Sequence, residues 1–437
     1  MPQAKSYIYT EGKHIQRVIR SLTYLLLVTI LAQEGRLGLH GIQYPALSSD
    51  AGPTGLPFLC EVIIIAIVGV FCFGIISGEI RILSSWYLNW SVGSVYWNSI
   101  AILLSYILNI EQTAGGFGAF RMIFEGLSLF VVVSNLTWSS KSLRITEVLF
   151  VIVGAFHSLV IGLSYFRPGI LPFATNIIEG QPFRYAGLFV QPSRVSLLIG
   201  IAFIIAFVRL ASDWVKLTNV FFYVITLSLL FVGLVLSQTR SIELAIPLAV
   251  VFALSQITKP GGRTQVLTRL LIIVGGLGLL VAIAIPTQLG FSRLSDISAN
   301  VLQNQRGYIW EIAIQIIMTH PFGTGFAGLL PLTGFLEIPH AHNMYLHWGV
   351  MFGWPGLVLF CLLIVRVYKD SGLRLVKSLM SEGQTVSFMA LRSAWVVCLL
   401  AFISEPYLIT NTGYWFWLLA GLLIAPLANP ESDGPIR

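Results

Sequence analysis

The chain has 437 residues, of which 56% are hydrophobic and only 10% are charged, and its mean hydropathy is +0.83. A soluble domain carries about 25% charged residues, so this composition excludes a soluble enzyme and predicts a polytopic membrane protein. The formal net charge of +7 is typical of basic cytoplasmic loops, and we expect no nucleic-acid partner. The four cysteines stand in apolar runs without metal-like spacing, so neither a disulfide framework nor a metal site is expected.

Long apolar runs predict that the chain crosses the membrane many times. A spanning helix needs about 20 mostly apolar residues, and in lipid only helices and closed barrels satisfy the backbone polar groups. We therefore expect an all-α polytopic bundle of about twelve transmembrane helices, which form one multispanning membrane domain over residues 1–437. The expected spans are 17–34, 58–77, 86–109, 117–137, 145–166, 194–209, 218–236, 240–257, 269–286, 343–366, 388–405 and 411–428.

The first of these spans has the weakest pattern. Its uninterrupted apolar part, from Leu22 to Ala32, is short and follows several basic residues, an arrangement that signal peptides share. No small-residue cleavage site follows it, so we interpret this segment as a retained anchor.

The distribution of basic residues predicts the orientation of the bundle, because cytoplasmic loops are enriched in lysine and arginine. With both termini in the cytoplasm, the inner loops hold all seven lysines, and the outward cations are all arginines. A guanidinium pairs with phosphate or carboxylate oxygens, so this pattern suggests an outward anion site. Chance, together with exclusion of lysine from translocated loops, is the alternative explanation. The lysines are Lys5, Lys13, Lys141, Lys216, Lys259, Lys369 and Lys377, and the outward arginines are Arg36, Arg121, Arg167, Arg184, Arg194, Arg240, Arg293 and Arg306.

Two outward segments, 167–193 and 287–342, are long enough to cap an active site. The second contains apolar residues at helical spacing between Arg306 and Thr319, which predicts a short helix before the tenth span. Pro321 marks the end of that helix. The helix is too short to cross the bilayer, so we expect it at the membrane surface, either covering a cavity or simply packed on the bundle.

Ionisable side chains stand at the boundaries of several spans. His340 and His342 precede the apolar run 343–366, and Arg240 and Arg306 occupy similar boundaries. A titratable group at such a place is costly to hold and is usually functional. The simplest chemistry for this set is a base that removes a proton beside a site that holds an anion. The histidines could instead be structural hydrogen-bonding groups, whereas a His-x-His metal site lacks a third ligand with sensible spacing.

Three segments carry a resemblance to a known family. The first is Leu-Ser-Gln-Thr-Arg-Ser at 236–241, and the second combines Arg-Gly-Tyr-Ile-Trp at 306–310 with Pro-Phe-Gly-Thr-Gly at 321–325. The third is His-Asn at 342–343, followed after nine residues by Gly-Trp-Pro-Gly at 353–356. In these motifs the chain resembles the superfamily of bacterial O-antigen ligases and O-antigen or exopolysaccharide polymerases.

The resemblance implies a metal-independent, inverting membrane glycosyltransferase that needs no cofactor. Such proteins take a glycan linked to undecaprenyl pyrophosphate at the periplasmic face of the bacterial inner membrane and transfer it to an acceptor hydroxyl. The acceptor is a lipid A–core sugar for ligases and the end of another glycan for polymerases. Many ligases have leucine where this chain has Trp310, which weakens the choice of ligase over polymerase. We expect a ligase-like enzyme, with a polymerase as the next alternative and a transporter of the same lipid-linked glycan as the rival from another class.

The resemblance also assigns roles to individual residues. His342 is the expected general base, because an imidazole can accept a proton near neutral pH. His340 is the alternative base if the local turn differs, and Asn343 supports His342 in the motif.

Arginines are the expected ligands of the pyrophosphate, because they can stabilise the negative charge that grows on the leaving group. Arg240 and Arg306 are the first candidates, and Arg184 and Arg194 are weaker ones. Glu243, one turn after Arg240, is expected either to orient that guanidinium or to neutralise it. Trp310 is expected to stack on a sugar or to lie in the interfacial aromatic belt.

Overall fold

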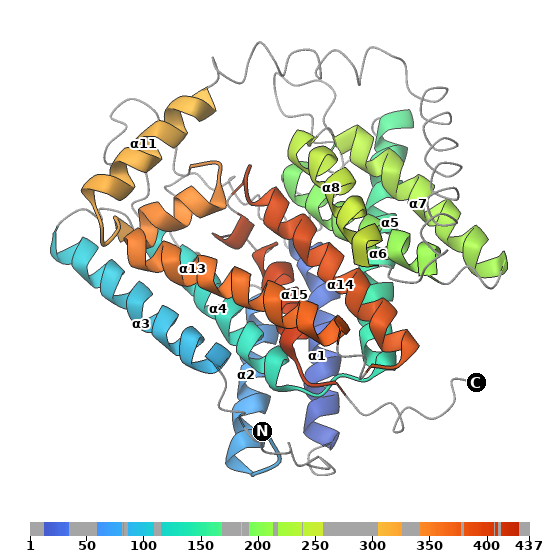
Figure 1. Cartoon of the computed structure of the whole chain (residues 1–437), viewed down its shortest axis with the longest axis horizontal. Coiled ribbons are helices and arrows are strands. Elements are labelled where there is room, and N and C mark those ends of the chain that lie inside the picture. The colour runs from blue at the N-terminus through green and yellow to red at the C-terminus, as the bar shows by residue number, and fades with distance from the viewer. Residues whose placement is uncertain are drawn as a thin grey trace.

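The computed structural model of the chain describes residues 13–34, 59–80, 82, 86–108, 115–167, 185, 192–212, 217–237, 239–256, 305–325, 341–376, 380–405, 407–409 and 412–427. Within these residues the chain forms helices and no strand, so the all-α prediction is confirmed (Figure 1). The helices are α1 (Lys13–Glu34), α2 (Leu59–Ile76), α3 (Trp86–Ile107), α4 (Gly115–Asn135), α5 (Ser140–Phe166), α6 (Pro192–Ser212), α7 (Leu217–Ser237), α8 (Arg240–Gln256), α11 (Gln305–Thr319), α13 (Met344–Val376), α14 (Glu382–Ala401), the short 3-10 helix η2 (Tyr407–Ile409) and α15 (Gly413–Ile424).

Most of the expected spans coincide with a helix of this structure, but the expected number of twelve is not confirmed. Five of the described helices, α5, α6, α7, α13 and α14, are long and apolar enough to cross a membrane. The span 269–286 lies outside the described residues. The span 411–428 is shorter than expected, because α15 has only 12 residues, a rise of about 18 Å against about 30 Å of hydrocarbon.

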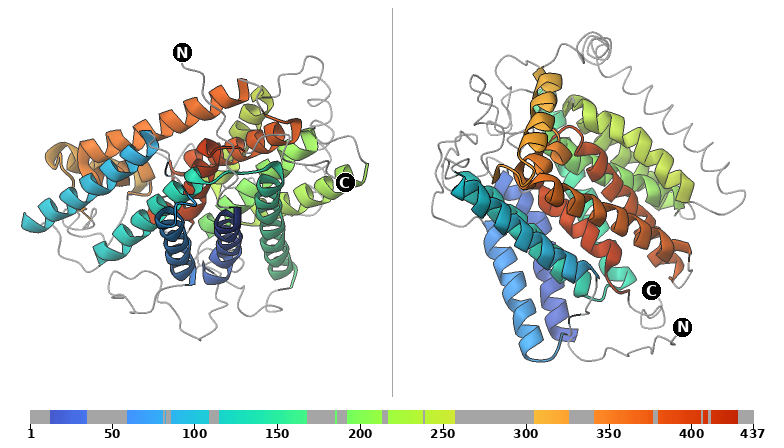
Figure 2. Two further views of the ribbon diagram at one scale, coloured as in Figure 1. Left: turned by 90° about the horizontal axis from the view of Figure 1, so that it is seen from below. Right: turned by 60° about the vertical axis from the view of Figure 1, so that its left-hand side comes forward.

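Helix α6 forms the centre of one part of the bundle. It packs against α5, α7, α8 and α14, and nearly all of its residues from Pro192 to Leu210 are buried. Figure 1 shows α5, α6, α7 and α8 gathered on one side of the molecule. In Figure 2, α1 and α2 lie side by side, and α3 runs along α13, as their contacts require. A helix surrounded by other helices can be apolar on every face, which explains the unbroken apolar sequence of α6.

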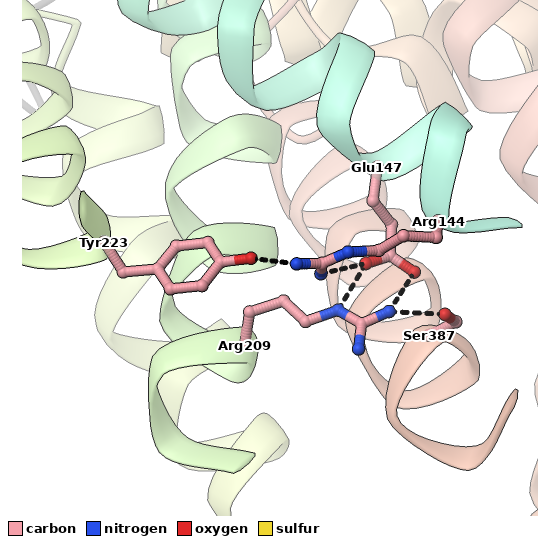
Figure 3. Close-up of polar contacts among 5 residues, drawn as sticks. All are labelled: Arg144, Glu147, Arg209, Tyr223 and Ser387. Atoms are coloured by element: carbon pink, nitrogen blue, oxygen red, sulfur yellow. Dashed lines mark hydrogen bonds and ion pairs between the residues drawn. The ribbon is translucent and has the colours of Figure 1, made fainter. Parts of the chain in front are cut away.

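A buried ion pair joins four helices at the end of the bundle where α5 begins and α6 ends. The guanidinium of Arg209 lies 2.5 and 2.9 Å from the two carboxylate oxygens of Glu147 and donates a hydrogen bond to the Ser387 hydroxyl at 2.5 Å (Figure 3). Arg144 lies 3.5 Å from the same carboxylate and donates to the Tyr223 hydroxyl. Because these side chains come from four helices, the network cross-links α5, α6, α7 and α14 and fixes the ends of these helices relative to one another.

Helix α13 is not the single straight span that the apolar run 343–366 suggested. Gly353 has φ 66° and ψ −169°, which breaks the helical course in the middle of the Gly-Trp-Pro-Gly motif. Residues with positive φ are unfavourable for side chains with a Cβ, so glycine is suited to this position. Pro355 follows the break, where its missing N–H removes no helical hydrogen bond.

The turn after α11 fits into this break. Trp354 N donates to the carbonyl of Pro321 at 3.0 Å, and Thr324 N donates to the carbonyl of Val350 at 2.8 Å. Gly323 also has positive φ (90°), and its backbone approaches Met351 so closely that an added Cβ would lie 2.2 Å from the Met351 oxygen. The motifs at 321–325 and 353–356 therefore form one joint, which sets the position of α11 relative to α13.

The predicted short helix before the tenth span is confirmed as α11, which ends two residues before Pro321. Its apolar face packs on the first part of α13 at the edge of the bundle (Figure 1). The buried residues of this contact are Ile309, Ala313, Ile316, Ile317, Ala341 and Val350. The helix thus brings its first turn, with Arg306, toward the segment that precedes α13.

Candidate active site

His342 lies two residues before the start of α13 and is the first residue of the His-Asn motif. Its backbone adopts a left-handed conformation with φ 47°, which is uncommon for a residue other than glycine. The next residue, Asn343, is buried and caps α13: its side-chain oxygen accepts a hydrogen bond from Leu346 N at 3.1 Å. A strained residue beside a well-made cap indicates a constrained side chain, and strain of this kind gathers at functional sites. The imidazole of His342 remains 30% exposed.

Glu405 lies between His342 and Arg306. One carboxylate oxygen is 3.6 Å from Nδ1 of His342, and the other is 3.8 Å from Nη2 of Arg306. Glu405 follows the end of α14 in a bend that is attached to α13, because Met344 N donates to the carbonyl of Phe402 at 2.7 Å. The structure therefore brings two of the predicted site residues together around a carboxylate that the sequence analysis did not select. Glu405 stands at the end of the span 388–405, so the criterion that selected His342, an ionisable group at a membrane boundary, applies to it as well.

Arg306 and Trp310 lie one turn apart on α11. The guanidinium of Arg306 is 52% exposed, so it is accessible to a ligand. Trp310 is half-buried, and its indole nitrogen is buried without a hydrogen-bond partner in the part of the chain that the structure describes. An indole N–H usually finds an acceptor when it is buried, which makes Trp310 a candidate contact for a polar ligand.

Tyr407 connects the same bend to the start of α6. Its hydroxyl donates a hydrogen bond to the carbonyl of Ser193 at 3.2 Å. Burial raises the pKa of the Tyr407 phenol well above its ordinary value, the negative charge of Glu405 acts in the same direction, and the positive charge of Arg194 opposes both. Arg194 directly follows Ser193, whose carbonyl accepts this hydrogen bond, so the predicted ligand lies near the bend that carries Glu405.

The predicted ligand Arg240 is the first residue of α8. Thr239, just before it, is buried, and its hydroxyl lies 2.8 Å from the hydroxyl of Ser196 on α6. The starts of α6 and α8 are therefore held side by side, with Arg194 on one and Arg240 on the other. Glu243, one turn into α8, is exposed.

These contacts form a continuous path from Thr239 through α6, Tyr407 and Glu405 to His342 and Arg306. The first turns of α6, α8, α11 and α13 consequently meet at one end of the bundle. A helix start carries a partial positive charge, which favours a bound anion. Together with the arginines, this end can hold a phosphorylated ligand beside an imidazole. His340 and Arg184 lie outside the described residues, as do most of the segments 167–193 and 287–342.

The comparison with known families agrees with the motifs. Residues 225–361 match the protein-family model described as O-antigen ligase, which confirms the resemblance to that superfamily over this region. The matched segment includes Arg240, Arg306 and His342 and ends before Glu405. A search of curated proteins found no match. Since five of the described helices are long and apolar enough to cross a membrane, the chain is a multi-pass membrane protein.

Proposed function

We propose that the chain is a membrane glycosyltransferase that moves a glycan from undecaprenyl pyrophosphate to an acceptor hydroxyl, with lipid A–core as the acceptor in the manner of an O-antigen ligase. The observation that carries this proposal is the meeting of His342 and Arg306 around one carboxylate, at an end of the bundle that is rich in helix starts. The match of residues 225–361 to the O-antigen ligase model supports the same class of chemistry.

In the proposed reaction the acceptor oxygen attacks the anomeric carbon of the donor sugar. The bond between that carbon and the pyrophosphate oxygen breaks, and its electron pair leaves with the pyrophosphate. His342 receives the hydroxyl proton on Nε2, since its Nδ1 faces Glu405. A single displacement of this kind inverts the anomeric configuration.

Arginines stabilise the leaving group in this mechanism. Arg306 and Arg240 bind the pyrophosphate, because a planar guanidinium can donate two parallel hydrogen bonds to phosphate oxygens. Arg194 and Arg184 assist from the start of α6 and from the preceding loop. Fixed positive groups aimed at growing negative charge are the usual source of such stabilisation, so we propose that no metal ion is required.

We propose that the protein lies in the bacterial inner membrane with both termini in the cytoplasm and the site on the periplasmic face. Two described lysines support this orientation. Lys141 is at the start of α5 and Lys369 is near the end of α13, both away from His342 and Arg306. Cations concentrate on the cytoplasmic side of membrane proteins, so the end with the site is the outward one.

Two alternatives to a ligase can be distinguished from it by specific residues or by their position. A polymerase would use the same residues with a glycan acceptor, and Trp310 at the position of the usual leucine favours it. A transporter of the lipid-linked glycan would carry its polar groups near the membrane midplane. His342, Arg306 and Arg194 instead stand at helix starts, which favours the transferase.

The test is transfer by purified protein, with a lipid-linked glycan donor and a chelator present. His342→Ala should lower turnover by about 100-fold or more, the range of proton-transfer catalysis, while donor binding is retained. His340→Ala is the matched control and should keep substantial activity. An active His342 variant beside an inactive His340 variant would show that the base is wrongly assigned, and loss of wild-type turnover in chelator would contradict the metal-free mechanism.

A further inference from the structure

The position of Glu405 poses a problem for a site that binds pyrophosphate. Its carboxylate lies 3.8 Å from Nη2 of Arg306, a guanidinium that the donor needs. A carboxylate beside a proposed phosphate ligand repels the donor and competes for the arginine. The side chain of Glu405 is only 19% exposed, so its charge is poorly screened by water.

The contacts of Glu405 with His342 and Arg306 are both looser than hydrogen bonds. The distances of 3.6 Å to His342 and 3.8 Å to Arg306 exceed the 2.7–3.2 Å that is usual for N–H···O bonds. One carboxylate oxygen faces Nδ1 of His342 and the other faces Nη2 of Arg306. The contact between Glu405 and Arg306 is long and the guanidinium is half exposed, so a phosphate group that binds the guanidinium through two hydrogen bonds can replace the carboxylate.

We infer that Glu405 is a positioning residue with two states: it is the counter-anion of Arg306 in the empty site and the orienting partner of His342 in the loaded site. This inference rests on the proposed function. When the donor pyrophosphate occupies Arg306, the carboxylate moves closer to His342 and accepts a hydrogen bond from its Nδ1–H. That bond fixes the tautomer in which Nε2 can accept the proton of the hydroxyl, and it stabilises the imidazolium that results. The base is thereby prepared only when the donor is in place.

The surrounding backbone allows this change with a small movement. The bend that carries Glu405 is fixed on one side by the bond from Met344 N to the Phe402 carbonyl and on the other by the bond from Tyr407 to Ser193. A shift of about 1 Å would shorten the contact to Nδ1 of His342 from 3.6 Å to hydrogen-bond length.

Glu405→Gln separates the two states, because it removes the charge and keeps the size of the side chain. The affinity for undecaprenyl pyrophosphate should rise by roughly two- to fivefold, the scale of a half-exposed ion pair, since the carboxylate then no longer competes for Arg306. The turnover number should fall by at least about 10-fold, because the amide neither fixes the tautomer nor stabilises the imidazolium. A purely structural role would lower affinity, turnover and thermal stability together. Glu382→Gln, an exposed glutamate at the far end of α14, is the matched control and should change neither quantity.

A double variant tests whether the tighter donor binding of Glu405→Gln arises through Arg306. In an Arg306→Gln background, Glu405→Gln should no longer tighten binding of undecaprenyl pyrophosphate. The inference is overturned if Glu405→Gln alone leaves donor binding unchanged or weakens it, or if it leaves the turnover number unchanged. In that case the proposed function still stands, provided that the wild-type protein transfers glycan. If the wild-type protein binds the donor but transfers no glycan to any acceptor, the proposed function fails, and the inference fails with it.

Discussion

The joint between α11 and α13 offers a test of how the site is positioned. In Gly353→Ala the new Cβ would lie 2.1 Å from the carbonyl oxygen of Pro321 and 2.6 Å from the carbonyl carbon of Phe322. Both are backbone atoms, so rotation of a side chain cannot relieve the two clashes. The turn at 321–325 must move away from α13, and α11 with Arg306 must move with it.

The cost of this substitution follows from the local geometry. A residue other than glycine in the left-handed region costs about 1–2 kcal/mol. Separation of the turn also removes the hydrogen bonds from Trp354 N and Thr324 N, which contribute about 1 kcal/mol each. The sum, about 3–4 kcal/mol, is the expected loss of stability, and the clash with the backbone of Pro321 and Phe322 is what displaces the turn. A displacement of about 1 Å at a catalytic group can cost about 100-fold in rate, so we expect a loss of that order.

The assay combines glycan transfer with thermal unfolding of the purified variant. Gly93→Ala on α3 is the control, because nothing lies within 4 Å of the point that its Cβ would occupy and the residue is exposed. We expect Gly93→Ala to retain wild-type turnover and Gly353→Ala to lose it, even at temperatures where the variant remains folded. Turnover of Gly353→Ala within about twofold of wild type, with unchanged stability, would refute the positioning role of the joint.

Two further predictions concern the anion site and the orientation. Arg306→Lys and Arg240→Lys should each keep the positive charge yet lower the transfer rate by about 10-fold or more, because an ammonium group cannot donate the two parallel hydrogen bonds of a guanidinium. Near-normal rates in both variants would remove these residues from the site. In a variant without the native cysteines, a membrane-impermeant thiol reagent applied from outside should label Ser295→Cys and not Lys141→Cys. Equal labelling of both in sealed vesicles would contradict the proposed orientation.

Helices were the most predictable part of this protein. Uninterrupted apolar runs require helices in lipid, and the spacing of Ile309, Ala313 and Ile316 together with Pro321 predicted α11 closely. The break in α13 could not be foreseen in the same way. The break at Gly353 is stabilised by a turn that lies elsewhere in the sequence, and local patterns do not reveal that partner.

The site residues that belong to local sequence motifs were predictable, whereas those brought to the site by tertiary packing were not. His342 and Arg306 stood out because each is ionisable at a membrane boundary. Their common neighbour Glu405 comes from the end of α14, and only the packing of α14 beside α13 brings it to them. The role of Tyr407 in holding that bend has no sequence signal that we can identify.

The placement of arginines at helix starts supports the idea of a shared anion. Arg194, Arg240 and Arg306 stand in the first turns of α6, α8 and α11, where a cation opposes the helix dipole at a cost of about 0.3–1 kcal/mol each. In the proposed orientation, Lys141 at the start of α5 lies at the cytoplasmic end of the bundle, where cations are preferred. The same preference disfavours cations at the opposite end, so these three arginines conflict both with the helix dipole and with this preference. Residues that break local rules are concentrated at functional sites, and an anion held between the helix starts removes the conflict: Glu405 in the empty site and pyrophosphate in the loaded one.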